Sequence, residues 1–98
     1  MRRGTTPTAL FRCNLDLTGW DVFVTFEQTG VELTKTDATV QSEDGGCTVM
    51  VKLSQNDTLN FKVGDAQAQI RAYRNGKAVA SSVFYFQVQD VLMDGVIP

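Results

Sequence analysis

Apolar and polar residues alternate along most of this chain, and no other sequence feature restricts its fold as strongly. The alternation is clearest over residues 11–15, 22–26 and 47–53, where every second residue is apolar. Because successive side chains of a β-strand point to opposite faces, this pattern predicts strands with one buried and one solvated face. No helical periodicity runs over a comparable length. The chain is therefore expected to fold mainly as antiparallel β-sheet.

Turn residues separate these strands and mark further ones. Gly30 ends the second strand, and alternation resumes from Val31 to Lys35. The sequence Glu43-Asp44-Gly45-Gly46 predicts a hairpin turn in front of the segment 47–53. That segment is the most regularly amphipathic strand of the chain, so we expect it to be central in its sheet.

A long hairpin is expected over residues 66–88, with its turn at Asn75-Gly76. A two-residue turn would bury Tyr85 and expel Phe84 and Phe86, whereas a three-residue loop that includes the preceding arginine does the reverse. Burying the two phenylalanines removes more apolar surface from water, at about 25 cal/mol per Å². We therefore expect the three-residue loop.

One short helical turn is expected near residues 54–60, where Ser54 can cap the helix and Asp57 stands three residues later, as in a capping box. The strands and this crossover predict an all-β fold, an immunoglobulin-like antiparallel β-sandwich of about seven strands over residues 8–90. Residues 1–7 are expected to form an N-terminal arm, and residues 91–98 a C-terminal tail.

Charge and residue types narrow the range of functions. The chain has 98 residues, nine Lys and Arg against eleven Asp and Glu, and no His. The net charge is −2, whereas proteins that bind nucleic acids carry an excess of positive charge. We therefore expect no nucleic-acid partner. Without His, Ser-His and Cys-His nucleophiles and His-containing zinc sites are excluded. We therefore expect no enzymatic activity, no cofactor and no metal site.

The chain also carries no sequence signal for a membrane. Its apolar runs are far shorter than the roughly 20 residues that span a bilayer, and residues 1–8 contain no apolar signal segment. We expect no membrane partner and synthesis in the cytoplasm.

The two cysteines, Cys13 and Cys47, both fall on inward strand faces. In the expected topology the first and fifth strands flank the second. Two strands with one strand between them lie roughly 9.5 Å apart, beyond the ~7 Å limit between Cα atoms for a disulfide. We therefore expect two buried free thiols.

Ten residues are candidates for an interface with a partner. Aromatic side chains and Met are enriched in interfaces, and three aromatics and one Met fall on outward faces. The arginines of the arm and the apolar residues of the tail complete the set, because a tail this apolar is more often docked than free in water. The candidates are Arg2, Arg3, Phe23, Met50, Tyr73, Tyr85, Val91, Leu92, Val96 and Ile97.

Across nearly its whole length the chain resembles a family of short proteins encoded by tailed phages and prophages of Gram-positive bacteria. The resemblance rests on an ordered set of segments: Arg3 to Thr8 (RGTTPT), Val22 to Gln28 (VFVTFEQ), Leu53 to Leu59 (LSQNDTL) with Phe61, Gln69 to Ala72, Ala80-Ser81, Val91-Leu92 and Gly95 to Ile97.

The resemblance implies an immunoglobulin-like structural component of the virion, of the kind found as capsid decoration, in head fibres, or at tails and baseplates. Its partners would be other virion proteins or further copies of itself. An alternative is a β-sandwich module that binds a host-surface glycan or receptor, in which outward aromatic rings stack on sugars. The family brings no catalytic residues with it.

Overall fold

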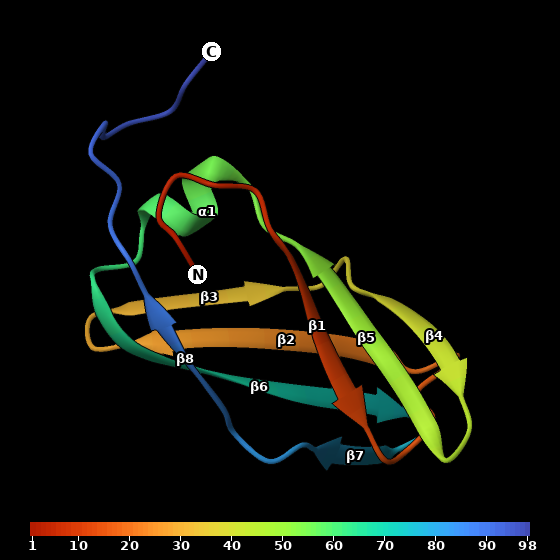
Figure 1. Cartoon of the computed structure of the whole chain (residues 1–98). Helices are drawn as coiled ribbons and strands as arrows, with labels where there is room; N and C mark the ends of the chain where they lie inside the picture. Colours follow the sequence, from red (N-terminus) through yellow and green to blue (C-terminus); the bar gives the residue numbers. More distant parts are fainter.

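The computed structural model describes residues 1–98 as two antiparallel β-sheets packed face to face, with one short helix (Figure 1). The first sheet has the order β1 (Thr8–Cys13), β5 (Gly46–Lys52), β4 (Thr39–Glu43). The second has the order β3 (Val31–Lys35), β2 (Asp21–Gln28), β6 (Gly64–Arg74), with β7 (Lys77–Ala80) and β8 (Phe84–Val88) both paired to β6. The predicted all-β sandwich is confirmed, with eight strands instead of about seven.

The core lies between the two sheets and is formed by the predicted alternating residues. Val22, Val24 and Phe26 of β2 face inward. So do Cys47, Val49 and Val51 of β5, which is the central strand of its sheet as expected. The fully buried core comprises Phe11, Leu17, Val22, Val24, Phe26, Cys47, Val49, Val51, Leu53, Phe61, Ala66, Ala68, Ile70, Ala72 and Val88.

Five phenylalanines join the two sheets. Phe11 of β1 packs against Phe84 of β8, with ring centroids 4.9 Å apart, and Phe26 of β2 packs edge-on against Phe86 at 6.2 Å. Phe61 contacts both Phe26 and Phe86 from the segment after the helix. Tilted and edge-on pairs are the favoured aromatic geometries, so this cluster stabilises the sandwich beyond its buried area.

The last hairpin departs from the sequence prediction. Arg74 pairs with Lys77, so the turn is the two-residue Asn75-Gly76, and the expected three-residue loop is wrong. Both turn residues have positive φ, 49° and 81°. This is the geometry of a type I′ turn, whose twist matches that of the flanking strands, and it is favoured by the Asn-Gly pair.

Phe84, Phe86 and Val88 nevertheless face the core as predicted, because the chain gains one residue between β7 and β8. From the pair Arg71–Ala80 to the pair Ala68–Phe84, β6 runs three residues while the opposite chain runs four. At this irregular step Ser81 supplies the hydrogen-bond partners of the Ile70 backbone. Its N–H donates to the Ile70 carbonyl at 2.8 Å, and its hydroxyl accepts from the Ile70 N–H at 3.0 Å.

The predicted helical turn is confirmed as α1 (Gln55–Leu59), between β5 and β6. The Ser54 hydroxyl accepts from the Asp57 N–H and the Asp57 carboxylate accepts from the Ser54 N–H, which completes the capping box. The Lys35 ammonium also donates to Asp57 at 3.1 Å. Burial alone would raise the pKa of the Asp57 carboxyl, but the Ser54 N–H and the Lys35 ammonium hold that pKa below its ordinary value.

The strand order corrects the expectation for the cysteines. β1 pairs directly with β5, and Cys13 lies opposite Cys47 in their register. The expected intervening strand, β2, belongs to the other sheet. Both thiols are free as expected, but only Cys47 is buried and Cys13 is half-buried, and the expected separation of the two residues is wrong.

Gly46 marks a close approach between the first and fifth strands. A Cβ atom at this position would lie 1.9 Å from the Cys13 carbonyl oxygen and 2.9 Å from the Cys13 carbonyl carbon. Both contacts are with backbone, which cannot move without opening the sheet. The neighbouring Gly45 has no such contact, since a Cβ atom added there would have no neighbour within 4 Å. Its φ of +76° is nevertheless left-handed.

We expect Gly46→Ala to destabilise the fold by about 2–4 kcal/mol, because the added methyl group forces β1 away from β5. Gly45→Ala is the matched control and should cost only about 1 kcal/mol, the backbone strain of a left-handed residue. Urea unfolding of the two variants measures the difference. Equal losses of stability would contradict the close approach.

Candidate interaction surfaces

The sandwich is open on the side where β1 and β8 form the margins of the two sheets. A groove of about 360 Å³ lies there, and nine of its ten lining residues are hydrophobic. Phe11, Phe84 and Phe86 form its floor together with residues of the arm and Leu53, which follows β5. The lining residues are Met1, Pro7, Ala9, Leu10, Phe11, Phe26, Leu53, Phe84, Tyr85 and Phe86.

The backbone of β1 is unpaired along this open side, because β1 is the terminal strand of its sheet. The Leu53 N–H donates to the Pro7 carbonyl at 3.0 Å, so hydrogen-bonded pairs with β5 fall at odd-numbered residues. The N–H and C=O groups of Thr8, Leu10 and Arg12 therefore point away from β5. Leu10 is 64% exposed and lies opposite Met50 on the outer face of the first sheet. Such an edge is a template for another strand.

The N-terminal arm is docked against the chain that follows β8. The Met1 carbonyl accepts from the Gln89 N–H at 2.7 Å, and the Arg3 N–H donates to the Gln89 carbonyl at 2.9 Å. Arg2 forms an isolated parallel bridge with Gln89. The arm therefore covers the end of this margin and leaves the β1 edge uncovered.

Arg3, a predicted interface residue, is used within the fold. Its side chain is 19% exposed and donates to the carbonyls of Phe61 at 2.7 Å and Leu59 at 3.2 Å, at the end of α1. It also pairs with the Asp90 carboxylate at 2.8 Å. The Val91 N–H and then the Arg3 guanidinium hold the pKa of the Asp90 carboxyl below its ordinary range. Arg2 stays exposed, although it donates to the Asp90 carbonyl.

The C-terminal tail, residues 91–98, leaves the end of the sandwich near α1 and projects away from the sheets (Figure 1). Gln55 holds it through two hydrogen bonds with the backbone of Ile97, at 2.8 and 3.1 Å. Most of its apolar side chains are solvent-exposed, and only Val91 is half-buried. The exposed ones are Leu92, Met93, Val96 and Ile97.

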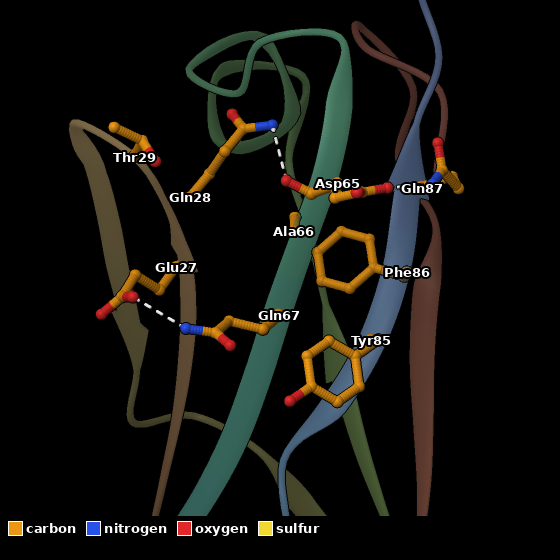
Figure 2. A pocket seen from close by; sticks show the side chains of 9 residues that line it. All are labelled: Glu27, Gln28, Thr29, Asp65, Ala66, Gln67, Tyr85, Phe86 and Gln87. Carbon is orange, nitrogen blue, oxygen red and sulfur yellow. Dashed lines mark hydrogen bonds between the residues drawn. The ribbon is translucent and has the colours of Figure 1, made fainter.

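A second surface is a shallow polar hollow of about 510 Å³ on the outer face of β2, β6 and β8 (Figure 2). Glu27, Gln67 and Tyr85 form one row across the three strands, as the register places them opposite one another. Gln67 donates to the Glu27 carboxylate at 2.8 Å. Tyr85 is 79% exposed, so its ring stands beside these polar groups as an open apolar face.

The upper part of the hollow is also hydrogen-bonded. The Gln87 amide donates to the Asp65 carboxylate, and the Gln28 amide donates to the Lys62 carbonyl at 2.6 Å. The Gln28 amide also donates to the Asp65 carbonyl at 3.4 Å, and Figure 2 shows Gln28, Asp65 and Gln87 next to the Phe86 ring. The hollow therefore presents fixed amide and carboxylate groups next to one exposed aromatic ring.

The ten predicted interface residues do not form one surface. Arg2, Arg3 and the tail residues gather near α1, whereas Tyr85 lies at the hollow. Phe23 and Tyr73 are exposed on the outer face of the second sheet, near Arg71, and Met50 is half-buried on the outer face of the first sheet. Sequence reasoning missed Leu10, whose signal was an apolar residue at a polar position of the alternation.

Metal sites and membrane-spanning helices are two further features that could indicate a function. No three His, Cys, Asp or Glu side chains come together as a group that could hold a metal ion. No helix has the length and apolarity needed to cross a membrane. Comparison with known protein families, curated proteins and solved structures finds no match.

Proposed function

We propose that this chain is a structural or decoration protein of a phage particle, without enzymatic activity, that works through protein–protein contacts. The observation that carries the proposal is the unpaired β1 edge next to an apolar groove, in a chain that also presents an exposed apolar tail. An edge strand gives affinity through backbone hydrogen bonds, and a neighbouring groove gives specificity through side chains. The resemblance to phage and prophage proteins supplies the virion location.

The strand order supports an immunoglobulin-like relationship. β1, β5 and β4 follow the order of strands B, E and D of that fold, and β3, β2, β6 and β8 follow C′, C, F and G. The fold's first strand, A, would lie beside B, and here no strand lies beside β1. The open edge therefore lies on the side that strand A occupies in that fold.

The tail of a neighbouring copy is the occupant that best suits this place. In an extended segment alternate side chains share a face, so Val91, Met93 and Ile97 would all point the same way. That face can enter the groove while the tail backbone pairs with the outward N–H and C=O groups of β1. A contact in which one copy's tail binds the next copy's edge is heterologous, and it builds rings or filaments.

We expect the purified chain to form oligomers whose mass, measured by light scattering, rises with concentration. Leu10→Pro removes one outward N–H of β1, at an edge where proline is tolerated, and should leave a folded monomer. Leu10→Thr keeps that N–H and is the matched control, which should still assemble. Met93→Asp with Ile97→Asp should weaken assembly by more than about tenfold, because both side chains lie on the face that enters the groove and burying charge is costly.

A wild-type chain that stays monomeric at every concentration would contradict this route of assembly. The same holds if Leu10→Pro assembles like the wild type while its circular dichroism shows an intact fold.

The virion location has its own test. We expect the chain in purified particles of the phage or prophage that encodes it, at a fixed ratio to the major capsid or tail protein. Quantitative mass spectrometry of gradient-purified particles measures this ratio. A chain found only in the soluble fraction of the lysate would contradict the structural role.

The polar hollow favours a second candidate, binding of a host-surface glycan. An exposed aromatic ring can stack on the apolar face of a sugar, and fixed amides and carboxylates can bind its hydroxyl groups. Tyr85, Gln67 and Glu27 supply these groups side by side.

For this candidate we expect co-sedimentation with purified cell-wall polysaccharide of a Gram-positive host, reduced at least about tenfold by Tyr85→Ala. Tyr73→Ala is the control, since Tyr73 is exposed on the same sheet but lies outside the hollow. Equal binding by both variants, or no sedimentation of the wild type, would contradict a glycan site here.

A further inference from the structure

Cys13 and Cys47 lie directly opposite each other on neighbouring strands, β1 and β5. Cys13 is odd-numbered, so this is one of the hydrogen-bonded pairs of β1 and β5, whose Cα atoms lie about 5.5 Å apart. This separation lies within the roughly 4.4–6.8 Å range found for disulfides. Both side chains point into the sandwich, because Cys13 follows Phe11 at a spacing of two and Cys47 is buried. The backbone therefore already holds the two thiols in a position to bond.

The two thiols differ in access. Cys47 is fully buried, and its thiol donates to the Leu15 carbonyl at 3.3 Å. Cys13 is half-buried and lines an opening of about 260 Å³ between the two sheets, together with Ala80, Ser82 and Phe84. A small reagent can thus reach Cys13 from solvent, whereas Cys47 is buried and does not line the opening.

We propose that Cys13 and Cys47 form a thiol-exchange site. The two thiols react with a low-molecular-weight disulfide and become joined by an intramolecular disulfide. The Cys13 thiolate attacks one sulfur of the small disulfide, whose S–S bond breaks and releases one thiolate. The Cys47 thiolate then attacks the Cys13 sulfur of the mixed disulfide and releases the second. The protein loses two protons and two electrons, and the small disulfide is reduced to two thiols.

Burial, and then the groups next to Cys13, determine the pH dependence of this exchange. Burial and the neighbouring Cys47 thiol raise the pKa of the Cys13 thiol, and the Arg12 guanidinium opposes them. Arg12 is itself paired with Glu43 at 3.5 Å, and no other charged group lines the opening. Because the thiolate is the nucleophile and its pKa is raised, exchange should be slow at neutral pH and should speed up about tenfold per pH unit through about pH 8 without levelling off there.

The product would tie β1 to β5 at the end of the open side. A disulfide stabilises mainly by restricting the unfolded chain, and this one closes a long loop from the first strand to the fifth. The oxidised chain should therefore melt at a temperature about 10 °C or more above that of the reduced chain.

The test incubates the folded, reduced protein with excess oxidised glutathione at about pH 8, followed by acid quench and intact mass measurement. The wild type should lose two hydrogens and form no disulfide between chains. Cys47→Ser should stop at the mixed disulfide and gain one glutathione. Cys13→Ser should stay unmodified while folded, because its remaining thiol is buried, and should react once the chain is denatured.

Three results would overturn the proposal. One is a wild type that ends as a stable glutathione adduct, which would show that Cys47 does not reach Cys13. Another is a disulfide-linked dimer as the main product. The third is a folded Cys13→Ser variant that reacts as fast as Cys47→Ser.

Discussion

The extra residue between β7 and β8 is the constraint on which the rest of this structure depends. Without it, the register set by the Asn75-Gly76 turn would continue into β8 and bury Tyr85. With it, Phe84 and Phe86 turn inward opposite Ala68 and Ala66, whose small side chains leave room for the rings. Phe11 of the opposite sheet then packs on Phe84, which joins the two sheets.

The same step produces both candidate surfaces. Phe84 and Phe86, once turned inward, form the floor of the groove next to the free edge of β1. Tyr85, which lies between them, is turned outward and supplies the ring of the polar hollow. The groove and the hollow therefore share Tyr85 and Phe86 of β8, and a change of register in β8 would alter both. The cysteine pair does not depend on it, because it rests on the pairing of β1 with β5.

The sequence predicted what depends on local periodicity. Alternating residues identified the strands and their buried faces, Ser54 and Asp57 identified the helical turn, and apolar area identified Phe84 and Phe86 as core residues. The turn at Asn75-Gly76 was predicted wrongly. The prediction assumed one register along the whole hairpin, whereas the irregular step at Ser81 gives β7 and β8 different registers against β6.

Periodicity does not predict how distant strands are arranged. Which strand lies beside β1 depends on which strands belong to each sheet. The expected topology placed the second strand between the first and the fifth, so the distance from Cys13 to Cys47 was predicted wrongly. The polar hollow was also missed as a site, because its row of side chains meets only through the pairing of three strands.

The most direct test of this account is a nuclear Overhauser spectrum of the protein with labelled aromatic rings. The register predicts contacts between the rings of Phe84 and Phe11 and between those of Phe86 and Phe26, with none from Tyr85 to either partner. Contacts from the Tyr85 ring to Phe11 or Phe26, in place of those from Phe84 and Phe86, would mean that β8 continues the register of β7. The core, the groove and the hollow described above would then all be wrong.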